Sequence, residues 1–251
     1  MRTRFILIQP SHAGNVGAAA RAIKVMGFDD LVLVAPRWPD VLSRPEAIER
    51  ASGATDVLRR ARAVATLEEA LDGVGYLCAT VMTPRDFGPP THAPRAHLTT
   101  LAAAQESVAF LFGSERYGMR NEDVYRCHAA LRIPTDPDYG SLNLAAALQV
   151  IAYEWRTCLT DTTPVRAEPV EAGPSTGSGR TEAADAQSVA RMLSHWEQSL
   201  VDIGFLDPAA PKKLMPRLNQ LFNRAQPTPE EVHILRGIAK AMSQAGRKPK
   251  L

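Results

Sequence analysis

Three segments of the chain combine small, polar and charged residues in patterns that suit ligand binding or catalysis. They are residues 11–21, 111–119 and 133–147, and each follows a short apolar run that reads as a buried strand. Ligands of α/β proteins bind beyond the carboxyl ends of such strands. The three segments are therefore the candidate site of this chain.

Each segment alone also has a purely structural interpretation. Asn15 can cap a helix, and Gly17 and the alanines after it permit close helix packing. Ser141 can cap a long helix that runs toward Arg156. A single segment therefore does not establish a function.

Several other kinds of site are excluded by missing patterns. No G-x-G-x-x-G follows the first strand, and the chain has neither a P-loop nor an H-E-x-x-H sequence. The run Asp136-Pro137-Asp138 resembles the start of a calcium loop, but Ala147 stands where a bidentate Glu is needed. The three cysteines lie too far apart for a Cys-x-x-Cys motif. We expect no metal site.

Strands and helices alternate over the first 160 residues. Apolar runs predict strands near residues 5–8, 31–34, 76–80, 108–112 and 130–133. After the first strand, a turn over residues 11–17 and an alanine-rich helix to about Met26 are expected, with Gly27 ending the helix. This alternation predicts an α/β domain with a mostly parallel sheet.

The composition changes twice in the last third of the chain. Residues 161–184 are rich in Pro, Gly, Ser and Thr, which predicts a flexible linker. Beyond it only helical patterns occur, with Leu214, Leu218, Leu221 and Phe222 on one stripe, and another helix from Glu230. We therefore divide the chain into an α/β domain (1–160), a linker (161–184) and a small helical domain (185–251).

Positive charge is concentrated at the C-terminus. Residues 1–160 contain 17 basic and 17 acidic side chains, whereas residues 185–251 contain 10 and 6. This surplus favours an acidic partner, with nucleic acid the first candidate. No apolar run is long enough to span a membrane, and residues 5–8 are too short for a signal peptide, so a cytosolic location is expected.

Taken in order, the three segments resemble the SPOUT class of RNA methyltransferases, in the SpoU/TrmH-type branch that methylates ribose 2′-hydroxyls. Its N-x-x-x-x-x-R pattern is complete from Asn15 to Arg21, and its F-G-x-E-x-x-G pattern from Phe112 to Gly118. Its I-P-x(n)-S-L-N-x-x-x-A pattern runs from Ile133 to Ala147. The resemblance implies a domain with a deep C-terminal trefoil knot, an exception to the usual absence of knots.

The resemblance also implies S-adenosylmethionine as the cofactor, held by the loops of the knot. The corresponding positions in this chain are Thr80, Val81, Met82, Gly113, Ile133, Gly140, Ser141 and Leu142. Apolar walls and backbone hydrogen bonds from such residues suit an adenine ring. The reaction would be an in-line displacement at the sulfonium methyl by a ribose 2′-oxygen.

The family assigns Arg21 to the ribose hydroxyl, often as general base. A guanidinium whose pKa lies above about 12 gives up its proton rarely, so stabilising the alkoxide and holding a phosphate is the other open role. Asn15 would orient Arg21 or a phosphate, and Glu115, in the segment that ends at Gly118, would tie that segment to a neighbouring loop. The remaining catalytic candidates are expected near the cofactor and the nucleotide, and they are Tyr139, Ser141 and Asn143. Tyr139 could stack on a flipped base.

The C-terminal segments are similar to the helical extension of bacterial tRNA methyltransferases that act on ribose 32 of the anticodon loop. This implies tRNA as partner, a homodimer with the site completed across its interface, and an RNA clamp of basic residues. The clamp residues would be Lys212, Lys213, Arg217, Arg224 and Arg236. Two alternatives stay open: a SPOUT enzyme acting on rRNA or another tRNA nucleotide, and a non-catalytic RNA-binding protein on the same scaffold.

Overall fold

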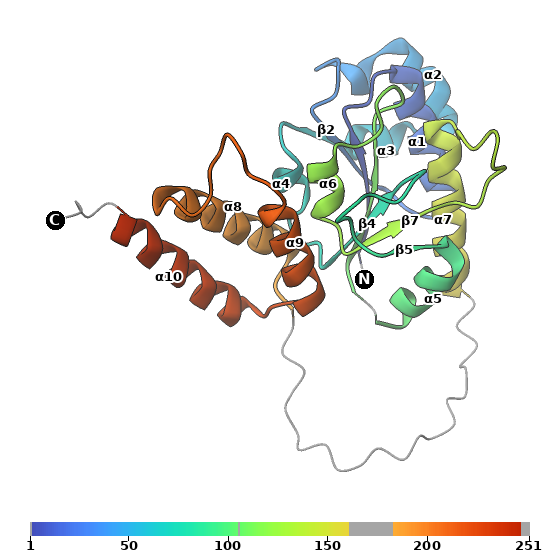
Figure 1. The fold of residues 1–251 in the computed structure, drawn as a ribbon. Helices are drawn as coiled ribbons and strands as arrows, with labels where there is room; N and C mark the ends of the chain where they lie inside the picture. The colour runs from blue at the N-terminus through green and yellow to red at the C-terminus, as the bar shows by residue number, and fades with distance from the viewer. Residues whose placement is uncertain (1, 105, 161–182, 247–251) are drawn as a thin grey trace, which may run out of the picture.

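The computed structural model describes residues 2–104, 106–160 and 183–246 (Figure 1). Its centre is a parallel sheet of seven strands in the order β3-β2-β1-β6-β4-β7-β5. The strands are β1 (Thr3–Ile8), β2 (Asp30–Val34), β3 (Arg62–Val64), β4 (Tyr76–Thr80), β5 (Thr91–His92), β6 (Val108–Phe112) and β7 (Ala129–Leu131).

The central strands are buried on both faces, as parallel strands covered by helices must be. Strand β1 pairs with β2 and β6, so that Phe5 lies opposite Leu31 on one side and Phe110 on the other. Alternate side chains then enter two separate cores. Phe5 and Phe110 belong to one core together with Trp155, while Ile6 belongs to the other.

Helices cover the two faces unequally. One core takes buried side chains from α1 (Ala13–Val25), α2 (Pro45–Ala51), α3 (Thr55–Arg60), α5 (Pro94–Ala104) and α7 (Leu144–Thr160). The other core takes them from α4 (Leu67–Ala70), α6 (Asn121–Tyr125) and the start of α8 (Ala186–Asp202). Two short 3₁₀ turns, Val41–Ser43 and Ser52–Ala54, flank α2.

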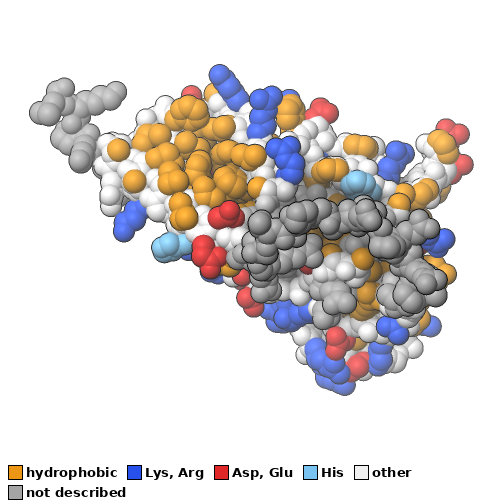
Figure 2. Space-filling view, turned by 90° about the horizontal axis from the view of Figure 1, so that it is seen from below, with side chains coloured by type: hydrophobic (Ala, Val, Ile, Leu, Met, Phe, Trp, Pro, Cys, Tyr) orange, Lys and Arg blue, Asp and Glu red, His pale blue; other side chains and the backbone are white. Residues whose placement is uncertain are grey.

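Helices α8, α9 (Leu214–Ala225) and α10 (Pro229–Gly246) form the helical extension. Val189, Met192, Leu193 and Val232 are among the side chains of its own small core. The indole N–H of Trp196 donates to the carbonyl of Leu235 at 2.9 Å and joins α8 to α10. Figure 2 shows hydrophobic side chains gathered on the face of the extension seen from below.

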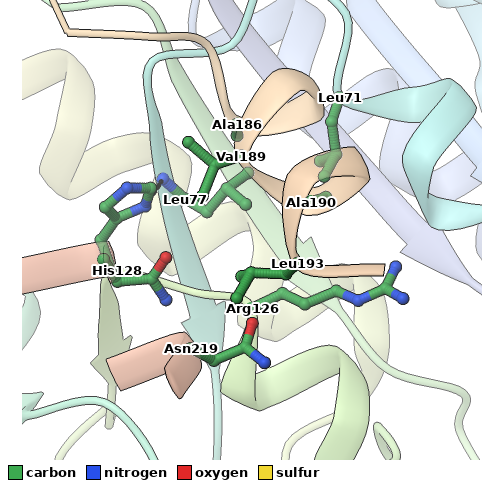
Figure 3. A pocket seen from close by; sticks show the side chains of 10 residues that line it. Leu71, Leu77, Arg126, His128, Ala186, Val189, Ala190, Leu193 and Asn219 are labelled. Carbon is green, nitrogen blue, oxygen red and sulfur yellow. Dashed lines mark hydrogen bonds between the residues drawn. The ribbon is translucent and has the colours of Figure 1, made fainter. Parts of the chain in front are cut away.

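The extension is docked on the α/β domain beside α4 and α6 (Figure 1). The backbone N–H of Ala186 donates to the carbonyl of Val74 at 2.8 Å, and the amide of Asn223 donates to the carbonyl of Cys127 at 3.0 Å. Figure 3 shows His128 and Leu193 at the hollow in this contact, which has a volume of about 10 Å³. That is the size of about one water molecule, so the contact is closely packed.

The fold class predicted from the sequence is confirmed, with differences at element ends. Strand β7 is Ala129–Leu131 and not residues 130–133, because the neighbouring strands β4 and β5 pair with it only as far as Leu131. The predicted turn over residues 11–17 is wrong beyond His12: α1 begins at Ala13, so Asn15 and Gly17 lie inside it. The trefoil knot stays a prediction, and the proposed linker lies outside the described residues up to 182.

Gly17 permits the close packing of α1 on α2. A Cβ atom built on Gly17 would lie 2.0 Å from the carbonyl oxygen of Ala47, whereas one on Gly14 would lie 3.5 Å from the Arg50 side chain, an ordinary contact. We predict that Gly17→Ala lowers the free energy of unfolding by at least about 2 kcal/mol through overpacking.

Gly14→Ala is the matched control in the same helix, with an expected change within about 1 kcal/mol. Urea unfolding of both variants is the measurement. Equal stabilities of the two variants would show that α1 and α2 are not packed as described.

Candidate active site

The three chemistry-bearing segments meet at one edge of the sheet. Strands β1, β6, β4 and β7 are neighbours in that order and run in parallel, so their carboxyl ends lie together. The segments at residues 11–21, 111–119 and 133–147 follow β1, β6 and β7, and the loop beginning at Val81 follows β4. Sheet topology therefore collects positions that are up to about 130 residues apart in sequence.

The Glu115 carboxylate joins the first segment to the second. One oxygen accepts from the backbone N–H and the hydroxyl of Ser11, at 2.9 and 2.8 Å, and the other accepts from the Asn15 amide at 2.9 Å. Burial raises the pKa of Glu115, but the hydrogen bonds from Asn15 and Ser11 outweigh it, so that the pKa is lowered. Glu115 is therefore an ionised anchor at neutral pH.

Asn15 also reaches the third segment. Its side-chain oxygen lies 3.4 Å from the amide nitrogen of Asn143, which donates to it. The other end of the Asn143 amide accepts from the backbone N–H of Ala145 at 2.9 Å and so caps the start of α7. Glu115, Asn15 and Asn143 thus form a chain of hydrogen bonds across all three segments.

Two cap assignments made from the sequence are therefore wrong. Asn143, and not Ser141, supplies the side-chain cap of α7, because the helix begins at Leu144. Asn15 lies in the first turn of α1, where its side chain is turned to Glu115 and not to the helix backbone. Ser11, which the sequence argument left without a role, is a further member of the network. Its position directly after a strand, in a short polar run, was the sequence feature that could have identified it as a site residue.

The second segment is a tight hairpin. Ser114 and Gly118 exchange backbone hydrogen bonds of 3.0 and 2.8 Å, and Gly118 has a φ of +67°, which favours glycine. A Cβ atom on Gly113 would lie 2.3 Å from the carbonyl carbon of Gly118. The motif glycines therefore close the loop that presents Glu115.

The third segment bends through Asp136, whose carboxylate accepts from the backbone N–H groups of Asp138 and Tyr139 at 2.9 and 3.1 Å. Tyr139 is 82% exposed, and the neighbouring Ser141 and Leu142 are also exposed. Gly140 is half-buried, as is Ile133, which packs against the main core. This loop therefore leaves Tyr139, Ser141 and Leu142 accessible to a ligand.

The loop after β4 lies beside the third segment. The backbone N–H of Val81 donates to the carbonyl of Leu131 at 2.9 Å, and Met82 is exposed. The Thr80 hydroxyl oxygen is buried, and the described part of the chain gives it no hydrogen-bond partner. A buried hydroxyl without a partner is costly, which fits a ligand that would complete it.

Arg21 stands apart from the hydrogen-bond network. It lies on α1, two turns beyond Asn15, with its side chain exposed. The residues that the structure describes give it neither an ion pair nor a hydrogen bond. The guanidinium is therefore free to contact an anionic ligand.

The residues of the predicted RNA clamp lie in two different environments. The ammonium of Lys213 lies 3.8 Å from the ring centre of Phe87, and the Arg217 guanidinium carbon lies 5.6 Å from it. Phe87 belongs to the loop that begins at Val81, so this loop contacts α9 directly. The remaining clamp residues are exposed, and no ion pair is found for them in the described chain: Lys212, Arg224 and Arg236.

Neither a metal-binding cluster nor a membrane-spanning helix is found within the described residues. Across residues 2–104, 106–160 and 183–246, no group of three or more His, Cys, Asp or Glu side chains could hold a metal ion. Over the same ranges, every helix is too short or too polar to cross a membrane.

Comparison with known families matches both parts of the chain. Residues 2–153 match the SpoU rRNA Methylase family. Residues 187–250 match the family described as tRNA methyltransferase TrmJ, C-terminal domain.

Two curated relatives match almost the whole chain. The tRNA (cytidine/uridine/adenosine-2′-O-)-methyltransferase TrmJ of Pseudomonas aeruginosa is 42% identical, over 98% of this chain and 95% of its own length. The tRNA (cytidine/uridine-2′-O-)-methyltransferase TrmJ of Photorhabdus laumondii is 38% identical, over 98% of both chains.

Solved structures give the same result. TrmJ from Zymomonas mobilis (Z. mobilis ZM4) superposes with a TM-score of 0.80 at 30% identity, covering 96% of this chain and 99% of that one. A probable methyltransferase from Bordetella pertussis superposes with a TM-score of 0.59 at 49% identity, over 63% of this chain and 96% of its own. The chain therefore belongs to the SpoU methylase family and, because both of its parts match, to the TrmJ group of tRNA 2′-O-methyltransferases within it.

Proposed function

We propose that this methyltransferase transfers a methyl group from S-adenosylmethionine to the ribose 2′-hydroxyl of nucleotide 32, a cytidine or uridine, in the anticodon loop of tRNA. The observation that carries the proposal is the hydrogen-bond chain from Glu115 through Asn15 to Asn143. It joins the three motif segments at one edge of the sheet, where both reactants must meet. The names of the TrmJ relatives, which include cytidine and uridine in tRNA, support the substrate.

The residues present fit the cofactor. The buried Thr80 hydroxyl has no hydrogen-bond partner among the described residues, the Gly113 turn leaves no room for a side chain, and Ile133 and Leu142 provide apolar surface. The backbone of Val81, Met82, Gly140 and Ser141 would complete the binding site. S-adenosylmethionine, when bound, supplies a methyl group already activated on a sulfonium.

The protein's part in the reaction is to align the ribose 2′-oxygen and to manage its proton. We assign Arg21 to the substrate, where its guanidinium holds a phosphate and stabilises the oxygen as negative charge develops. The hydrogen bond to Glu115 holds Asn15, about two turns before Arg21 in α1, and so fixes the position of the first turn of this helix. Tyr139, exposed within the third segment, is assigned to stack on the base that leaves its own stack.

The helical extension is proposed as the tRNA clamp of a homodimer whose site is completed across the interface. The proposed clamp residues are Lys212, Lys213, Arg217, Arg224 and Arg236, of which two lie against Phe87 in the loop after β4. The matches at residues 2–153 and 187–250 support a division into the α/β domain (1–160), the linker (161–184) and the extension (185–251).

The first prediction concerns reaction and substrate together. Labelled S-adenosylmethionine and unmodified tRNA transcripts should give a 2′-O-methyl group at nucleotide 32, located by nuclease digestion and mass spectrometry. Arg21→Ala should lower turnover at least about 100-fold with cofactor affinity unchanged, because it removes a phosphate contact and transition-state stabilisation, and neither involves the cofactor. Arg59→Ala, on the exposed surface of α3, is the charge-matched control.

Other outcomes of this experiment select the alternatives. Methylation at another nucleotide, or of rRNA fragments alone, would assign the chain to a different RNA target within the same class. An inactive protein that also fails to bind the cofactor would favour a non-catalytic RNA-binding scaffold. A fully active Arg21→Ala enzyme would remove Arg21 from the reaction.

The second prediction concerns the Glu115 anchor. Glu115→Gln turns one acceptor into a donor that faces the donors of Ser11 or Asn15, and should lower the free energy of unfolding by about 1–3 kcal/mol at neutral pH. Because the pKa of Glu115 is lowered in the folded state, its stabilisation is full above the unfolded pKa of about 4.3 and is lost as the pH falls through the folded pKa.

The difference between wild type and Glu115→Gln should therefore shrink below about pH 5. Urea unfolding across this range is the measurement, with the exposed Glu122→Gln in α6 as control. A difference that stays constant with pH would show that the Glu115 charge does not anchor the segment.

The third prediction concerns the clamp. The double variant Arg224→Ala, Arg236→Ala should weaken tRNA binding about 10-fold at low salt and reduce the slope of log K against log salt by about two, one for each lost phosphate contact. Cofactor affinity should not change. An unaltered salt slope would exclude these two side chains from the tRNA interface, and Arg59→Ala again controls for the loss of charge.

A further inference from the structure

A hollow of about 790 Å³ lies beside the start of α1 and is open to solvent. Its volume is in the range of small-ligand sites. The walls come from α1 and the segment before it, from the loop after β2, from α2, and from Asn143. The charged and aromatic side chains of its lining include Arg37, Trp38, Arg44, Glu46 and Arg50.

Trp38 lines this hollow, and two arginine side chains lie over its ring. The guanidinium carbons of Arg37 and Arg44 lie 4.7 and 4.4 Å from the centre of its ring. Trp38 is 36% exposed, so part of its surface is accessible to a ligand. The two cation–π contacts hold the indole in place while leaving part of it accessible.

The hollow carries a surplus of positive charge, because Arg37, Arg44 and Arg50 line it against Glu46 and Glu49. Arg37 and Arg50 have no ion pair among the described residues, and Arg44 has only the long contacts of 3.7 Å to Asp40 and 3.9 Å to Glu46. Glu46 and Glu49 line the α2 wall, so the free positive charge is greatest on the Trp38 side. An anionic group is favoured there.

The hollow is continuous with the candidate active site. Asn15 and Asn143, which join the motif segments, also line it. The loop that carries Trp38 is fixed to the first segment, because the backbone N–H of Arg37 donates to the carbonyl of Pro10 at 3.2 Å. A group bound in the hollow is therefore held in a defined place next to the methylation site.

We propose that the Trp38 subsite (Arg37, Trp38 and Arg44) binds an unpaired RNA nucleotide next to the one that is methylated. The indole stacks on the base, and the guanidinium groups hold the adjoining phosphate. Unpaired nucleotides are recognised by this pairing of an aromatic face with cationic side chains. The proposal rests on the proposed function and adds to it a contact that positions the substrate.

The test uses the full-length protein and an RNA stem-loop with a seven-nucleotide loop. Trp38→Ala should weaken binding about 5- to 100-fold, the range found when one stacked base is lost, and Trp38→Phe should recover most of it. RNA should also quench tryptophan fluorescence in the wild type but much less in Trp38→Phe, because Trp155 is fully buried and Trp196 is half-buried.

Three further measurements separate a subsite from a structural role. Thermal unfolding, cofactor affinity and sedimentation velocity of Trp38→Phe and Arg37→Ala should match the wild type, while Arg37→Ala weakens RNA binding. Unchanged RNA affinity in Trp38→Ala and Arg37→Ala would overturn the subsite. An altered oligomeric state in these variants would also overturn it, since the face would then be a protein interface.

Failure of this proposal can be told from failure of the proposed function. A wild-type protein that binds no RNA would contradict the proposed function itself. A wild type that binds and methylates RNA, together with fully competent Trp38 variants, would leave the function intact and remove only the subsite.

Discussion

The ion–dipole contact of the Glu115 carboxylate with Ser11 and Asn15 is the interaction on which the site depends. Three donors converge on one carboxylate, and the resulting low pKa keeps it charged at neutral pH. Because Asn15 passes the connection on to Asn143, the loops after three different strands are held by one charge. Loss of that charge would free three loops at once, which explains why a residue with no assigned contact to the reacting atoms belongs in the motif.

Close backbone approach is the second constraint. Gly17 lets α1 pack on α2, and Gly113 lets the hairpin that presents Glu115 fold back on Gly118. Neither glycine has a side chain that makes contacts, but its small size lets the neighbouring backbone lie close to it. The position of Arg21 follows from this packing, since α1 carries it two turns beyond Asn15 on an exposed face.

The helical extension is not a separate appendage, because it is docked on the α/β domain. Backbone and amide hydrogen bonds from Ala186 and Asn223 fix it beside α4 and α6. Lys213 and Arg217 then lie against Phe87, in the loop that follows β4. This contact gives a direct physical link between the proposed tRNA clamp and a loop proposed to hold the cofactor.

The sequence by itself determined the α/β class, the helical end of the chain and the three motif segments, because strand runs, helical stripes and short motifs are local patterns. It missed the true start of α1 and the Asn143 cap, since helix ends are decided by which side-chain bonds form. It could not find the Trp38 subsite, whose residues carry no motif and whose hollow forms only when the loop after β2 lies beside the start of α1 and Asn143. Tertiary structure decided the hollow and the Glu115 network, because a parallel sheet brings together loop residues far apart in sequence.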